Sequence, residues 1–179
     1  MIVSDPSRRA IRRVERPTPS AAYSAAHLVG LGFRGWMTGL TRADLSNWAH
    51  VWTVYEQTAG PVNARRMVTD LACWVQRIQT TTEREIEVCS SDCIWFGRDE
   101  CVALSLIAAA QHDQSPHRRC PAMQACAAAL LGTDNVEPVL DTAVAFAGTL
   151  IEAGQILQPE QINLLHAEAS GREGDSPLH

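Results

Sequence analysis

Cysteines are the residues of this 179-residue sequence whose types and spacing could do chemistry. Three of the six lie within "EVCSSDCIWFGRDEC", residues 87–101, and a fourth follows in the spacing C-x3-C-x7-C-x18-C. The four are Cys89, Cys93, Cys101 and Cys120. Thiolates that gather around one point bind zinc or an iron–sulfur cluster. The spacing therefore suggests a metal site, in which His112 or His117 could replace one cysteine.

Two other interpretations of these thiols stay open. The spacing lacks the C-x2-C of common zinc sites and matches no familiar iron–sulfur pattern. A thiol redox role is one alternative, because Cys101 stands at the start of a predicted helix, whose dipole acidifies a thiol. Packing is the other, because a free cysteine behaves as a small hydrophobic residue. We interpret Cys73, beside Trp74, and Cys126, within "MQACAAALL", as packing residues.

The rest of the sequence carries no recognisable catalytic signature. It has no nucleophile elbow, P-loop, H-E-x-x-H or dinucleotide-binding motif, and "GLGFRG" follows no strand that would make it a phosphate loop. Lysine is absent, which excludes Schiff-base chemistry on a lysine. His27 and His50 lie on apolar stretches and are expected at core or boundary positions. The acids of "GRDE", residues 97–100, are expected to cap a helix. No catalytic residue is assigned.

Hydrophobic periodicity predicts helices and no sheet. The expected helices cover residues 20–40, 41–60, 61–81, 98–112, 116–131 and 138–153, with a short one after Pro159. The pattern Thr41-x-x-Asp44 predicts a helix start, while Gly60 and Pro61 mark an end and a new beginning. The prediction is an all-α protein, a compact bundle of six to seven helices with short loops and no significant sheet.

Apolar stripes indicate which helix faces should be buried. In residues 41–60 the predicted core stripe is Leu45, Trp48, Trp52 and Tyr55, and in residues 61–81 it is Val68, Leu71, Val75 and Ile78. The helix at 20–40 contains Gly30, Gly32, Gly35 and Gly39. Each interior glycine costs up to about 1 kcal/mol relative to alanine. We therefore expect another element to pack closely over a glycine face.

Charge divides the sequence unevenly. The formal charge is −5, but residues 1–19 hold five arginines against two acids, so the remainder carries −8. The arginines are Arg8, Arg9, Arg12, Arg13 and Arg16. We predict a basic flexible arm at 1–19, a single helical domain at 20–168 and a disordered tail at 169–179. The arm could bind an acidic partner or nucleic acid, or lie solvated against its own acidic body.

These features together give a functional hypothesis. No apolar run approaches the roughly 20 residues of a membrane span, and no apolar stretch of a secretory signal follows the first arginines, so we expect a cytoplasmic protein without membrane contact. The arginine-only basic composition is typical of a GC-rich bacterial genome. The favoured function is a regulatory or accessory factor that binds a protein partner and is tuned by metal or thiol state at residues 89–120. The alternative is a metalloenzyme with a Cys/His-held metal centre, and homo-oligomers are compatible with either.

Overall fold

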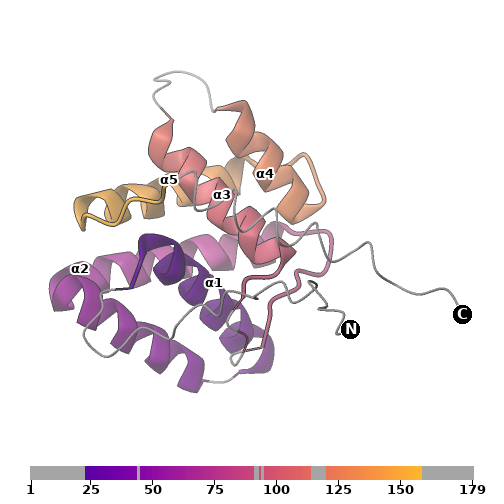
Figure 1. Cartoon of the computed structure of the whole chain (residues 1–179). Coiled ribbons are helices and arrows are strands. Elements are labelled where there is room, and N and C mark those ends of the chain that lie inside the picture. Colours follow the sequence, from indigo (N-terminus) through magenta and orange to yellow (C-terminus); the bar gives the residue numbers. More distant parts are fainter. Residues whose placement is uncertain (1–22, 44, 91–92, 94, 114–119, 159–179) are drawn as a thin grey trace, which may run out of the picture.

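The computed structural model describes residues 23–43, 45–90, 93, 95–113 and 120–158. This part of the chain contains five helices and no strand: α1 (Ala25–Arg42), α2 (Leu45–Thr81), α3 (Arg98–His112), α4 (Pro121–Leu131) and α5 (Glu137–Glu152) (Figure 1). The all-α class is confirmed. The count of five differs from the predicted six to seven. The helix predicted after Pro159, the basic arm and the tail lie outside the described residues.

The predicted boundary at Gly60 accounts for one helix of this difference. Gly60 has φ 76° and ψ 164°, which no right-handed helix contains, and helical residues continue on both sides of it within α2. Glycine tolerates this positive φ because it has no Cβ. Pro61 follows as the first residue of the second half, where its missing N–H costs nothing. The expected break is therefore present, as a kink that divides one long element.

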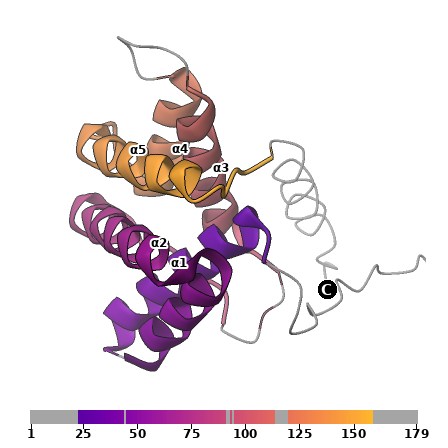
Figure 2. The ribbon, with the colours of Figure 1, turned by 90° about the vertical axis from the view of Figure 1, so that its left-hand side faces the viewer.

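The helices form two packed groups. α1 packs along α2, and α3 packs against both α4 and α5 (Figure 2). Contacts between α2 and α5 and between α1 and α3 join the two groups. At the centre the buried ring of Trp74 lies between Phe33 and Phe146, with ring centroids 5.6 Å apart in each case. None of the described helices is both long and apolar enough to cross a membrane.

The glycines of α1 allow its close packing against neighbouring elements. A Cβ built on Gly32 would lie 2.8 Å from Leu71 Cδ2, and one on Gly39 would lie 2.7 Å from Trp48 Cδ1, both inside van der Waals contact. Gly35 meets a side chain of α2 in the same way. The predicted glycine face is confirmed, and the close approach it permits offsets the low helix propensity of glycine.

The predicted helix start at Thr41 is wrong. α1 continues through Arg42 and ends at Ala43, whose φ of 53° is left-handed. The Thr41 hydroxyl donates back to the carbonyls of Met37 and Thr38, at 3.0 and 3.2 Å, as a threonine in the last turn of a helix often does. Asp44, the other half of the expected capping pattern, lies outside the described residues.

One of the two predicted core stripes is also corrected. The stripe in the second half of α2 is buried as expected. In the first half Tyr55 is buried, but Leu45 is 68% exposed and Trp52 is 37% exposed. Trp48 is half-buried over Gly39 of α1, and Val51 and Val54 are buried, with Val51 against Gly35 of α1. Contact with α1, rather than the size of the side chains, determines which face of the first half of α2 is buried.

Candidate functional site

The segment that carries Cys89 and Cys93 wraps around one buried arginine. We call residues 88–97 the cysteine loop. Arg34 projects from α1 and is only 6% exposed, and Glu100, in the first turn of α3, is fully buried. Arg34 Nε donates to Glu100 Oε1 at 2.6 Å, and Arg34 Nη2 donates to Oε2 at 3.1 Å. This bidentate ion pair joins α1 to α3 through two residues that are 66 positions apart in the chain.

The remaining donors of Arg34 bind the backbone of the cysteine loop. Nη1 donates to the carbonyls of Cys93 at 2.7 Å and Ser90 at 3.4 Å, and Nη2 donates to that of Trp95 at 2.5 Å. All five N–H groups of the guanidinium therefore have acceptors. Burial by itself would lower the pKa of Arg34, but hydrogen bonding and charge from Glu100 raise it overall. The loop is thus held by a permanently charged group.

Two further contacts complete the clamp. Glu100 accepts from the Gly97 N–H at 2.6 Å, so it caps α3 as the sequence indicated while also pairing with Arg34. The Phe96 ring lies 5.4 Å from the guanidinium carbon of Arg34 and covers Gly30. Burial, and secondly the charge of Arg34, lower the pKa of the nearby His27. The end of the cysteine loop is therefore fixed at Gly97 by the Glu100 carboxylate and at Phe96 by packing against Arg34 and Gly30.

A second ion pair fixes the chain at the start of the same segment. Arg84 Nη2 donates to Asp99 Oδ1 at 2.5 Å, and Arg84 Nη1 donates to Oδ2 at 3.0 Å. Asp99 also accepts from the Glu87 N–H at 2.9 Å, and Arg84 Nε donates to the Ala129 carbonyl of α4. Asp99 thus holds the chain just before the cysteine loop, at Arg84 and Glu87, and Glu100 holds the end of the loop at Gly97. The spacing of these two acids in the sequence did not reveal this role.

Cys89 and Cys93 lie close together in the cysteine loop. The Cys93 N–H donates to the carbonyl of Ser90, the residue directly after Cys89, at 3.0 Å. Burial raises the pKa of Cys89 to about 11, with further contributions from Glu100 and from a hydrogen bond to the Cys93 thiol. The two thiols are therefore direct neighbours, and Cys89 is protonated at neutral pH.

The other predicted metal ligands lie in different surroundings. Cys101 is buried, its Sγ lies 3.7 Å from the Phe96 carbonyl, and burial and Glu100 raise its pKa to about 11, against the acidified thiol that its helix position suggested. Cys120 is the residue before α4 and makes no side-chain capping hydrogen bond. Burial, and secondly electrostatic interaction with Cys120, raise the pKa of Cys126. His112 Nε2 lies 3.0 Å from the Leu157 carbonyl.

No three His, Cys, Asp or Glu residues in the described part of the chain form a group that could hold a metal ion. The four cysteines and His112 all belong to that part, whereas His117 lies outside it. The arginines of the basic arm, Arg8, Arg9, Arg12, Arg13 and Arg16, also lie outside it. Zinc or iron–sulfur binding and contacts of the arm stay predictions.

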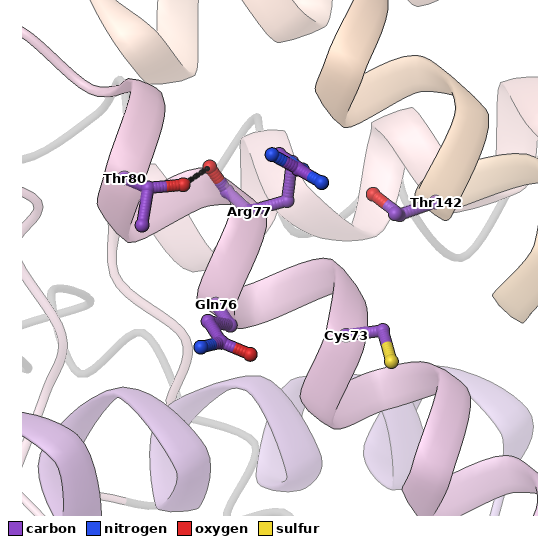
Figure 3. A pocket seen from close by; sticks show the side chains of 5 residues that line it. All are labelled: Cys73, Gln76, Arg77, Thr80 and Thr142. Atoms are coloured by element: carbon purple, nitrogen blue, oxygen red, sulfur yellow. Dashed lines mark hydrogen bonds between the residues drawn. The ribbon is translucent and has the colours of Figure 1, made fainter.

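One pocket in the described region was missed by the sequence reasoning. It has a volume of about 350 Å³ and lies between α2 and α5 (Figure 3). Its lining consists of Cys73, Gln76, Arg77, Thr80 and Thr142. The first four recur at i, i+3, i+4 and i+7 on α2, opposite the buried stripe, and this spacing could have identified them. The interpretation of Cys73 as a packing residue is wrong, because its side chain is exposed.

No protein-family model matches the chain, and no curated protein or solved structure matches it.

Proposed function

We propose that this chain is a cytoplasmic bacterial regulatory or accessory binding protein, whose partner-binding surface is the cysteine loop and whose affinity changes when Cys89 and Cys93 are oxidised to a disulfide. The observation that carries the proposal is the clamp of Arg34 on the loop backbone. Its guanidinium bonds the Ser90 and Cys93 carbonyls, so the positions of the exposed Ser90 and of the backbone at Cys93 depend on the same side chain.

Geometry supports this disulfide. The Cys89 and Cys93 thiols lie within hydrogen-bonding reach of each other, and the Cys93 N–H donates to the carbonyl of Ser90, the residue next to Cys89. A covalent bond between the sulfurs would move the Cys93 carbonyl relative to Arg34. The affinity of a partner that binds the loop would then depend on the oxidation state of the two cysteines.

The chemistry balances with a peroxide as oxidant. One thiol reduces hydrogen peroxide, forming a sulfenic acid and water. The second thiol attacks that sulfur, the S–S bond forms and a second water leaves. Because burial and Glu100 raise the pKa of Cys89 to about 11, little thiolate exists at neutral pH. The loop would stay reduced in the cytoplasm at rest and respond to sustained oxidation.

Tryptic mapping tests the bridge directly. Cleavage at Arg84 and Arg98 yields one peptide, residues 85–98, that contains both cysteines of the loop, whereas Cys101 and Cys120 fall elsewhere. After peroxide treatment we expect an internal disulfide in this peptide, seen as a loss of two hydrogens. Crosslinked peptides that join the loop to another cysteine would instead refute the pairing.

The binding function needs its own readout. The bait in the source cell extract is the wild-type protein, either reduced or peroxide-treated. A variant with Cys89→Ser and Cys93→Ser is used in the same way. We expect to recover a protein whose amount differs between the reduced and the peroxide-treated wild type. Its amount should be the same whether or not the variant is treated with peroxide. Equal recovery in both states contradicts the proposal. Elemental analysis of anaerobically purified protein tests the metalloenzyme alternative: stoichiometric zinc or iron lost in the same variant would favour it.

A further inference from the structure

We propose that the first half of α2 binds the same segment of a second copy of this chain, as an antiparallel pair of helices. Its outward side, which we call the dimer face, consists of Leu45, Ala49, Trp52 and Glu56. The dimer face shares no residue with the cysteine loop, and this inference does not depend on the proposed function. Three observations carry it: exposed apolar side chains, their spacing, and charges that match when one copy is turned end over end.

The centre of the dimer face is apolar and exposed to solvent. Leu45 is 68% exposed, Trp52 is 37% exposed, and Ala49 between them is exposed as well. α1 packs on another side of this segment. The neighbouring Thr53 donates its hydroxyl to the Ala49 carbonyl at 2.9 Å, so this hydroxyl needs no acceptor from a partner. Covering the centre of the face removes apolar surface from water, which favours association.

The spacing of the dimer face fits a second helix. Its four residues are separated by four, three and four positions, the alternation that keeps one stripe of a helix facing a neighbouring helix. The small side chain of Ala49 at the centre lets the two helix axes approach closely. When a second copy lies antiparallel and is centred on Ala49, Leu45 of one copy lies beside Trp52 of the other. Each exposed apolar residue is then covered by its counterpart.

Charges at the two ends of the stripe indicate that the partner is a second copy. Arg42, the last residue of α1, and Glu56 are both exposed, and each lies seven positions from Ala49. None of the three ion pairs found among the described residues uses either side chain. Within one chain about three turns of helix separate them, which is too far for an ion pair. In the antiparallel pair Arg42 of each copy lies beside Glu56 of the other, so a twofold dimer satisfies all four charges.

The size of the dimer face predicts a weak dimer. The kink at Gly60 ends the straight segment after about four turns of helix. A stable interface buries roughly 800 Å² on each partner, and one helix face of this length is smaller. We therefore expect a dissociation constant of roughly 10–100 µM at low ionic strength. Sedimentation equilibrium of the full-length chain from about 5 to 500 µM covers this range. A monomer at every concentration would leave the face to another occupant and overturn the proposal.

A charge swap tests the antiparallel register. Arg42→Glu places two negative charges at each contact between position 42 and position 56, and Glu56→Arg places two positive charges there. Each variant alone should have a dissociation constant roughly tenfold higher than wild type at low ionic strength. An equimolar mixture of the two variants restores opposite charges at both contacts. The dissociation constant of the mixture should therefore return to within about threefold of the wild-type value.

Two further variants separate the dimer face from net charge and from folding. Arg65→Glu changes the net charge by the same amount as Arg42→Glu, at an exposed position beyond the kink, and should associate like wild type. Leu45→Gln should raise the dissociation constant about tenfold or more through lost apolar contact, with helix content unchanged by circular dichroism. No gain on mixing the charge variants, wild-type association of Leu45→Gln, or equal weakening by Arg65→Glu would each overturn the proposal.

Discussion

The ion pair of Arg34 with Glu100 makes the sharpest prediction about this fold, because removing one partner or both should have different consequences. Arg34→Met keeps most of the side-chain volume but leaves the fully buried Glu100 carboxylate without its cation. Breaking a buried ion pair in this way costs about 3–5 kcal/mol of unfolding free energy. Glu100→Met strands the guanidinium instead and should cost a similar amount.

The double variant should be less destabilised than the sum of the two. With both charges removed no desolvated ion remains, and the residual cost comes from the loop carbonyls and the Gly97 N–H that lose partners, each about 0.5–1.5 kcal/mol. We expect a total of about 3–4 kcal/mol and therefore a coupling of at least about 2 kcal/mol between the two sites. Urea unfolding followed by far-ultraviolet circular dichroism measures each free energy by linear extrapolation.

A second readout links stability to the cysteine loop. Arg34→Met should increase the rate at which Cys89 and Cys93 react with a maleimide, since the Cys93 carbonyl loses its donor. Arg65→Met, at an exposed position of α2, serves as control and should change the unfolding free energy by less than about 0.5 kcal/mol. The reasoning fails if the Arg34 and Glu100 effects add within about 0.5 kcal/mol, or if Arg34→Met leaves labelling of the loop unchanged.

Three other predictions follow from packing, charge and titration. Gly32→Ala should destabilise by about 1–3 kcal/mol through overpacking, whereas Gly148→Ala, with no neighbour within 4 Å of the added carbon, should stabilise by up to about 1 kcal/mol. Opposite signs in urea unfolding are the test. Asp99→Asn, at the pair whose carboxylate is buried while its guanidinium is partly exposed, should cost about 2 kcal/mol, and Glu152→Gln at the exposed pair should cost under about 0.5 kcal/mol. Equal effects of the two substitutions on the unfolding free energy would contradict the assignment. Because burial and Glu100 raise the folded pKa of Cys101 from 9.0 to about 11, the unfolded state releases its proton first, and stability should fall by about 2 kcal/mol between pH 9 and 11; Cys101→Ala should reduce this slope.

Local signals predicted the helices well where the residues themselves start or end them. The predicted helix at 98–112 coincides with α3, since Gly97 precedes its acidic first turn and the chain leaves the helix at Asp113. Gly132, with φ 70°, ends α4 as its position suggested. These features act within one or two turns of chain, so neighbouring residues contain the information.

Interactions between distant segments escaped the sequence reasoning. Arg34 lay inside a glycine-rich stretch that was predicted to be a helix with a packing face, and nothing near it in the sequence indicates a partner at Glu100. The first half of α2 presented a convincing aromatic stripe, yet Val51 rather than Trp52 faces α1. Cys73 was assigned to packing because of its neighbour in sequence, although the helix turns it away from the core.

Sequence by itself determined the all-α class, the glycine face of α1, the break at Gly60 and the ends of several helices, because propensity, capping and periodicity depend on residues a few positions apart. Only the tertiary structure decided which edge of α2 is buried, that Cys89 lies beside Cys93, and that a guanidinium from α1 holds their loop. The physical reason is that an ion pair or a packed face needs two surfaces, and the second surface comes from a part of the chain that local patterns do not identify.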